Sequence, residues 1–268
     1  MDCSQVKYPI YVISKGRAYN PSTARNFVKH NVIFKLIVEP QEYDDYARVI
    51  PKRFIEILPF SNLGLGSFPA RNFCWEQSLA NGHERHFIFD DNIPSFGRLN
   101  YGKRTSGNDP KEAMSHLASF SDRFSNVGIS GFNYACFVNK ETKKPFYLNT
   151  HVYSGMLINN RLPFRWRLKY NEDVDLCLNA LHRGWCTILF NAFLIRKRST
   201  TEKHPGGNQT ELYQNNDPKK KALKSYSLQQ IWPQYAKVVQ RFGRTHHFVD
   251  WKKHFKHPLI KKAIHGQT

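Results

Sequence analysis

The sequence has 268 residues, of which 40% are hydrophobic and 14% aromatic, so the chain can bury a substantial core and is not disordered. It carries 40 Lys and Arg against 21 Asp and Glu, which gives a formal net charge of +19 at pH 7. An excess this large predicts a polyanionic partner, with nucleic acid favoured over an anionic membrane surface. A solvated basic face without a ligand is the less favoured alternative.

Cysteine usage and hydropathy suggest where the protein works. The five cysteines are scattered and form no CxxC pair, which is typical of the reduced thiols of an intracellular protein. No apolar run reaches membrane-spanning length, and the first residues show no signal-peptide pattern. We therefore expect a protein of the cytoplasm, or of the nucleus if the source is eukaryotic, that contacts no membrane. We also expect a monomer.

Strand and helix patterns alternate through the first 92 residues. Four such units predict a parallel sheet with helices on both faces, and ligands of such sheets bind beyond the carboxyl ends of the strands. The predicted strands are 8–14, 34–38, 54–58 and 86–89, and the predicted helices begin near 21, 40 and 69.

Charged and hydroxyl residues follow these strands, so they are expected to line one crevice. Lys15 and Arg17 on a Gly-containing loop can meet phosphate, and Glu39 can accept a hydrogen bond from a ribose or a base. Taken singly, each of these residues is more often a solvated loop charge. The candidates on the nucleotide side are Ser14, Lys15, Arg17, Glu39 and, inside the third helix, Arg71.

The apolar run His86-Phe87-Ile88-Phe89 ends in Asp90-Asp91-Asn92. Adjacent carboxylates at the end of a buried strand need a cation, a basic side chain or water. Oxygen ligands of this kind suit Mg²⁺ or Mn²⁺, which could hold the two phosphates of a nucleotide. The alternative is a strand end capped by Asp and Asn side chains.

The second half has a mixed pattern. The segment 94–110 is rich in Gly, Asn, Ser and basic residues and is predicted to be a mobile surface loop. His204 lies on a Pro-Gly-Gly loop that could fold back over the crevice, although loop histidines are usually solvated. The predicted elements are a helix at 111–124, strands at 127–138, 146–158 and 186–190, and a helix at 171–184.

The helix at 171–184 begins with acidic residues. Asn171 is a suitable N-cap, and Gly184 ends the helix. The acids of the first turn could simply satisfy the helix dipole. The catalytic alternative is that Asp173 removes a proton from an attacking hydroxyl.

The tail after residue 210 shows helical spacing and then a concentration of basic and aromatic residues. Basic side chains interleaved with aromatics suit a phosphate backbone and an unstacked base. A helix that packs its aromatics and exposes its lysines is equally compatible. The basic candidates are Arg244, His246, His247, Lys252, Lys253 and Lys256.

The order of these motifs resembles the TET-associated and base J-associated glycosyltransferases, which have the GT-A fold. The segments that carry the resemblance are YVISKGRA, LIVEPQEYDDYA, LPFSNLGLGSFPARNFCWE, FIFDDNI and YNEDVDLCLNALHRGWCT, within roughly residues 8 to 210. Members occur in bacteriophages and kinetoplastids and transfer a sugar to 5-hydroxymethylpyrimidines in DNA. The implied organisation is a GT-A domain at 1–210, with a nucleotide-binding half at 1–92 and an acceptor-side half at 93–210, followed by a basic helical extension at 211–268.

The resemblance implies a metal-dependent, inverting transferase with a UDP-sugar donor carrying glucose, N-acetylglucosamine or arabinose. Asp173 would be the base and Glu172 would orient the acceptor or sugar, with an exchange of roles with Asp175 left open. The nucleotide would bind Ser14, Lys15, Arg17, Glu39, Arg71 and Asp90, and Mn²⁺ or Mg²⁺ would bind Asp90, Asp91, Asn92 and His204.

The expected acceptor is hydroxymethylcytosine ahead of hydroxymethyluracil, in host cytoplasm if the chain is phage-encoded. A second basic group, Arg98, Lys103 and Arg104, would grip the DNA backbone together with the tail. The alternatives are a GT-A enzyme that acts on a glycan or a protein, and a non-catalytic DNA-binding module.

Overall fold

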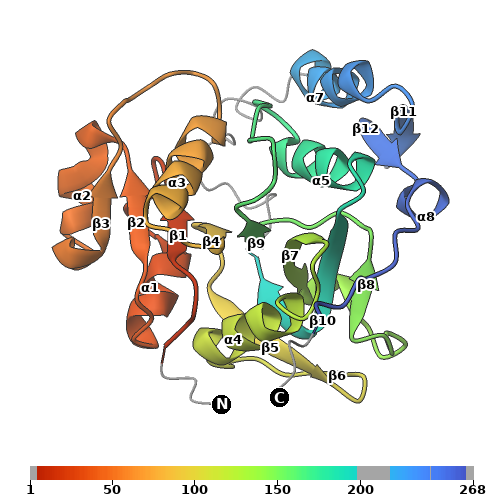
Figure 1. Cartoon of the computed structure of the whole chain (residues 1–268). Coiled ribbons are helices and arrows are strands. Elements are labelled where there is room, and N and C mark those ends of the chain that lie inside the picture. Colours follow the sequence, from red (N-terminus) through yellow and green to blue (C-terminus); the bar gives the residue numbers. More distant parts are fainter. Residues whose placement is uncertain (1–4, 198–217, 242, 264–268) are drawn as a thin grey trace.

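The computed structural model describes residues 5–197, 218–241 and 243–263. Figure 1 shows a mixed sheet surrounded by helices, with a small hairpin beside it. The ten-stranded sheet has the order β3-β2-β1-β4-β9-β7-β10-β5-β6, and β8 pairs with β10. The α/β architecture expected from the sequence is confirmed.

The first half of the sheet is parallel and matches the predicted alternation of strands and helices. β2 pairs with both β3 and β1, and β1 pairs with β4, all in the same direction. The elements are β1 (Ile10–Ile13), α1 (Ser22–Lys29), β2 (Lys35–Val38), η1 (Pro40–Glu42), α2 (Tyr43–Ala47), η2 (Lys52–Phe54), β3 (Ile55–Ile57), α3 (Phe68–Ala80) and β4 (Arg85–Asp90).

Beyond β4 the strand directions are mixed. β9 runs antiparallel between β4 and β7, so β7 again runs in the direction of β4 and both end at the same edge of the sheet. The elements are β5 (Ser95–Asn100), β6 (Lys103–Arg104), α4 (Pro110–Ser121), β7 (Val127–Tyr134), η3 (Ala135–Phe137), β8 (Phe146–Leu148), β9 (Gly155–Asn159), α5 (Glu172–His182) and β10 (Cys186–Arg196).

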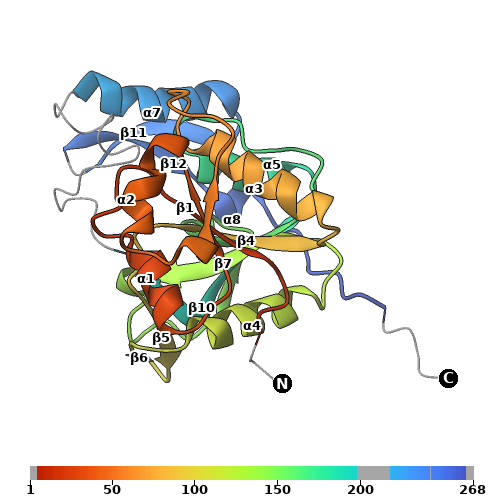
Figure 2. The same ribbon diagram turned by 90° about the vertical axis from the view of Figure 1, so that its left-hand side faces the viewer.

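The alternation of side chains along β4 builds a core on each face of the sheet. Phe87 and Phe89 belong to the cluster that contains Phe27 of α1 and the buried residues of α4. Ile88 points to the other face and joins the cluster that contains Trp75 of α3 and Leu176, Cys177 and Ala180 of α5. Figure 2 shows these two layers, with α1 and α4 on one side of the sheet and α3 and α5 on the other. Successive strand residues face opposite sides, so this short apolar run is buried on both.

Two predictions for the second half are wrong, the first of them only in part. The segment 94–110 is a surface loop only in part, because Ser95–Asn100 form β5, which pairs antiparallel with β10 and buries Phe96 fully, whereas most residues from 101 to 107 are exposed. The strand expected at 146–158 is two separate strands, β8 and β9. Asn149 and Ser154, with φ of 54° and 42°, lie between them, and such positive φ values do not fit an extended strand.

The sequence suggested a helical extension. This prediction is wrong in part, because the extension also contains two strands. A hairpin follows its first helix, because Pro233 comes directly after the helix and Gly243, with φ of 68°, lies between the hairpin strands. In Figure 1 the extension lies beside α5. The elements are α7 (Pro218–Ile231), β11 (Ala236–Arg241), β12 (Arg244–Val249) and α8 (Trp251–His254).

The extension packs on α5 through a continuous apolar cluster. Val174, Leu178 and Leu181 of α5 contact buried residues of the extension, including Leu228 and Trp232. Burial of such side chains contributes roughly 1.5–3 kcal/mol each. The extension is therefore attached to the main domain by a core of its own.

Candidate active site

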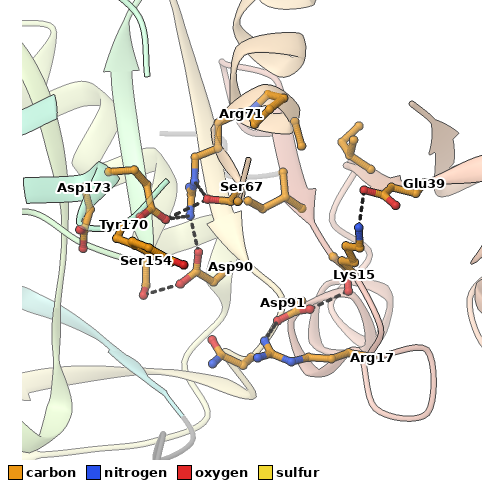
Figure 3. Close-up of a pocket in the computed structure, with 18 of the residues that line it drawn as sticks. Lys15, Arg17, Glu39, Ser67, Arg71, Asp90, Asp91, Ser154, Tyr170 and Asp173 are labelled. Atoms are coloured by element: carbon orange, nitrogen blue, oxygen red, sulfur yellow. Dashed lines mark hydrogen bonds and ion pairs between the residues drawn. The ribbon is translucent and has the colours of Figure 1, made fainter. Parts of the chain in front are cut away.

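A cavity of about 360 Å³ lies at the carboxyl ends of β1, β2 and β4 (Figure 3). This is the edge at which ligands of parallel sheets bind. Residues predicted from both halves of the sequence line it, which brings the nucleotide-side candidates and the acids of α5 together. These residues are Ser14, Lys15, Arg17, Glu39, Arg71, Asp90, Asp91, Asn92, Glu172 and Asp173.

Lys15 and Glu39 form an ion pair on one wall of the cavity. Lys15 Nζ lies 2.7 Å from Glu39 Oε1, and the second oxygen accepts from the backbone N–H of Asn62 and from Gln41 Nε2. Burial would raise the pKa of Glu39, but these hydrogen bonds outweigh it and lower the pKa below its ordinary value. Glu39 is therefore an ionised acceptor held in place.

Asp91 lines the cavity but is almost fully buried among polar partners. Arg17 Nη1 donates to one carboxylate oxygen, and Ser14 Oγ donates to the other at 2.7 Å. Burial raises the pKa of Asp91, although the Arg17 charge acts against it. Tyr46 Oη, 2.5 Å from Ser14 Oγ, completes this buried network.

Asp90 lies between two cations. Arg71 Nη2 donates to its Oδ1 at 2.7 Å, while Lys197 Nζ at 2.9 Å and Ser154 Oγ at 2.7 Å donate to its Oδ2. Burial acts to raise the pKa of Asp90, but the charges of Lys197 and Arg71 hold it well below its ordinary value. Arg71 is fixed from behind by the Trp166 ring, 4.7 Å from the guanidinium carbon to the ring centroid.

These contacts bear on the expected metal site. Both carboxylates of the acidic triplet are paired with basic or hydroxyl side chains, and Asn92 Oδ1 is buried without a hydrogen-bond partner. Within residues 5–197, 218–241 and 243–263, no group of three His, Cys, Asp or Glu side chains could hold a metal. His204 lies outside the described residues. As arranged, the described triplet does not fit Mn²⁺ or Mg²⁺, because the cation would have to displace a basic side chain.

The start of α5 differs from the expected cap. Asn171 adopts a left-handed conformation with φ of 56° and makes no side-chain cap. Its amide instead donates to the backbone oxygen of Lys224 in α7 at 2.6 Å. The residue thus marks the helix start as predicted, but its side chain ties the helix to the extension.

The three acids of α5 have three different environments. Glu172 accepts from Ser67 Oγ at 2.8 Å, and burial raises its pKa. Asp173 Oδ2 lies 3.1 Å from His151 Nε2 in an ion pair; burial would raise the pKa of Asp173, but the charge of His151 lowers it. Asp175 is 1% exposed and is absent from the residues that line the cavity.

Asp175 serves the packing of the extension. Both its oxygens accept from Arg167, and Oδ1 also accepts from Trp232 Nε1 at 2.7 Å. A buried carboxylate with this many donors is satisfied where it stands. The geometry therefore leaves Asp173 and Glu172 as the acids that can meet a substrate.

Sequence reasoning missed several residues of the site. Lys197 at the end of β10 and Lys224 on α7 line the cavity, and His151 pairs with Asp173. Each lies far along the chain from the residues it meets. No local sequence motif identifies Lys197, Lys224 or His151 as a site residue. Strand pairing and the docking of the extension bring these residues to the cavity.

The predicted DNA-contacting residues fall into two groups. Arg98, Lys103 and Arg104 are exposed on β5 and β6, and Arg104 Nη1 donates to the Ala135 backbone oxygen at 2.7 Å. The second group belongs to the extension. Its exposed members are Arg244, Lys252, Lys253 and Lys256, with His246 half-buried.

His247 in the second group differs from its neighbours. Burial and the nearby Lys224 charge lower the pKa of His247 to about 4, so this ring is neutral at pH 7. It therefore brings no positive charge to a phosphate.

In the described ranges, no helix has the length and apolar character needed to span a membrane.

The fold is an α/β sheet whose basic and acidic side chains gather at the carboxyl ends of the strands, which is where ligands of such sheets bind. The model of the TET-Associated Glycosyltransferase family matches residues 8–206. The chain belongs to this family and is a glycosyltransferase.

Other comparisons add little to this assignment. No curated protein matches the chain. Among solved structures, a protein from Desulfovibrio desulfuricans G20 described as a nucleotide-diphospho-sugar transferase is similar, with 10% identity and a TM-score of 0.36. The alignment covers 66% of this chain and 77% of that chain.

Proposed function

We propose that this chain transfers a sugar from a UDP-sugar to the hydroxymethyl group of a 5-hydroxymethylpyrimidine in DNA, hydroxymethylcytosine ahead of hydroxymethyluracil. The observation that carries the proposal is the composition of the cavity. Asp90 with its two cations and Asp173 with its histidine line the same space. A donor diphosphate and an acceptor hydroxyl can therefore be held side by side.

The basic side chains suit the donor diphosphate. Arg71, Lys197 and Arg17 each hold a carboxylate at the cavity and can exchange that contact for a phosphate oxygen. Their charges would then stabilise the negative charge that develops on the departing UDP. A requirement for Mn²⁺ or Mg²⁺ remains a separate expectation, because the cation must compete with the same side chains.

The Lys15–Glu39 pair suits the rest of the nucleotide. Glu39 is ionised and 8% exposed, so it can accept a hydrogen bond from a ribose hydroxyl or a base N–H. Lys15 is the more exposed partner, so its ammonium group can move to donate a hydrogen bond to a phosphate oxygen or a base oxygen. In the proposed arrangement the nucleotide lies over β1 and β2 and the sugar lies toward α5.

Asp173 is the proposed base. Its carboxylate takes the proton of the hydroxymethyl group as that oxygen forms a bond to the anomeric carbon. The bond from the anomeric carbon to the diphosphate oxygen breaks, and its electron pair leaves with UDP. Attack from the face opposite the diphosphate inverts the anomeric centre. Glu172, hydrogen-bonded to Ser67, orients the sugar.

Mass spectrometry tests the proposal. The protein is incubated with UDP-glucose, UDP-N-acetylglucosamine or UDP-arabinose and with duplexes containing hydroxymethylcytosine, hydroxymethyluracil or cytosine, with Mn²⁺ and with chelator. The DNA is then digested to nucleosides. A sugar-sized mass increase on a hydroxymethylated nucleoside supports the proposal, and no increase on either one refutes it. Transfer to a glycan or protein instead would identify a different acceptor.

A further inference from the structure

Five aromatic side chains form a continuous wall next to Asp173, which we call the aromatic wall. Tyr134 contacts Tyr153, with ring centroids 4.3 Å apart, and Tyr153 contacts His151 at 5.0 Å. His151 stacks on Trp251 of α8, with centroids 5.9 Å apart and an angle of 10° between the ring planes. Phe137 adjoins both tyrosines, at 5.5 Å from Tyr134 and 6.1 Å from Tyr153.

The aromatic wall links the two chemical centres of the cavity. At one end Tyr134 lines the cavity, and its hydroxyl lies beside Ser154, which donates to Asp90. Toward the other end His151 pairs with Asp173. An aromatic surface that passes from the donor side to the base is therefore available where the acceptor must lie.

Packing alone does not explain the whole wall. Phe137 is 65% exposed, although it sits on a well-formed turn directly after β7. Phe137 does not line the cavity itself, but its ring contacts Tyr134, which does, so its exposed face continues the aromatic surface outward from the cavity. Every nucleobase has a flat face that can stack on such a ring.

Positive charge flanks both ends of the aromatic wall. Arg104 is hydrogen-bonded to the backbone of Ala135, in the same turn that carries Phe137. Exposed Lys252 and Lys253 follow Trp251 directly at the other end. Two cationic groups with stacking rings between them match a strand whose backbone is held on both sides of one unstacked base.

We propose that the aromatic wall is the acceptor subsite and that it takes a pyrimidine turned out of the duplex, with Phe137 as its exposed stacking residue. This inference rests on the proposed function and adds that the acceptor base is turned out of the duplex when the sugar is transferred. It also assigns part of the acceptor subsite to the extension, because Trp251 lies beyond the residues matched by the family model.

The experiment compares Phe137→Ala with the wild type and with Tyr147→Ala. Tyr147 is also an exposed ring, at 37%, but it lies on β8 outside the aromatic wall. Loss of one stacking ring is expected to raise KM for the modified duplex about tenfold, with kcat at saturating DNA within about twofold. Tyr147→Ala is expected to match the wild type in both constants.

Fluorescence of 2-aminopurine placed beside the modified base reports extrusion directly. The wild type is expected to increase this fluorescence on binding, and Phe137→Ala should require about tenfold more protein for the same increase. If the wild type transfers sugar to DNA but Phe137→Ala behaves like Tyr147→Ala, or binding leaves the fluorescence unchanged, this subsite is wrong while the proposed function stands. If the wild type transfers no sugar to DNA, both are overturned.

Discussion

His151 Nε2 lies 3.1 Å from Asp173 Oδ2, and the His151 ring is stacked on Trp251 from the extension. The proposed base is therefore held by a residue on the segment before β9, and that residue is held by the extension. Burial acts to raise the pKa of Asp173, and the charge of His151 reverses this. The base is kept ionised and oriented at the same time.

Substitution of the acids of α5 should separate chemistry from packing. Asp173→Asn is expected to reduce kcat at least about 100-fold with the fold intact, because a general base is removed. Asp175→Asn should instead lower the free energy of unfolding by about 1–3 kcal/mol, because it weakens the bonds to Arg167 and Trp232. Steady-state kinetics and urea unfolding of both variants provide the measurements. Comparable reductions of kcat in both would contradict this division.

Removal of the His151 charge should change the pH dependence of transfer. His151→Gln retains a hydrogen-bond donor but carries no charge, so the pKa of Asp173 should rise. Asp173 must be ionised to accept a proton, and the acid limb of the pH–kcat profile should move to higher pH. The measurement is the pH–kcat profile of His151→Gln compared with that of the wild type, down to the lowest pH at which both proteins remain folded. An unchanged acid limb would show that His151 only fills space.

Lys197 and a divalent cation should compete for Asp90. Lys197→Ala frees Oδ2 from its ammonium partner, so Mn²⁺ should bind about tenfold more tightly in the absence of donor. Mn²⁺ titration followed by electron paramagnetic resonance measures this without any transfer reaction. Lys35→Ala removes a surface lysine paired with Glu56 and serves as the control. Equal Mn²⁺ affinity in all three proteins would place any metal elsewhere.

The lysines near the end of the extension should contribute to DNA affinity. Changing Lys252, Lys253 and Lys256 to Ala is expected to weaken DNA binding and to reduce the slope of log K against log salt by about 3, roughly 1 for each phosphate that is no longer neutralised. Fluorescence anisotropy at several salt concentrations gives both quantities.

A matched control removes the same charge from a different surface. Lys29, Lys35 and Lys52 are exposed on the α1, β2 and η2 side of the molecule. Their replacement lowers the net charge equally but should leave the salt slope within error of the wild type. If both triple variants behave alike, DNA affinity depends on overall charge rather than on the extension.

The sequence predicted the first half of the fold because local patterns decide it. Strands buried on both faces, such as β4, are short apolar runs, and breakers separate them from amphipathic helices. The residues after those strands share one edge by topology, which is why Glu39 and Asp90 could be grouped before any contact was known.

Long-range pairing decides what the sequence did not reveal. β5 is Gly- and Asn-containing and has weak strand propensity, yet pairing with β10 makes it a strand. Lys197 and His151 reach the site only through that sheet and through the turn before β9. The helical spacing in the tail was misleading, because residues 236–241 pair with 244–249 as an antiparallel hairpin instead of continuing the helix.

The hydrogen bond from Trp232 to the buried Asp175 has a consequence for engineering. The extension cannot be exchanged between relatives as an independent cassette, because the recipient helix would bury a carboxylate without one of its donors. A working chimaera must carry Trp232 and Asp175 together, and Lys224 with Asn171 as the second linked pair.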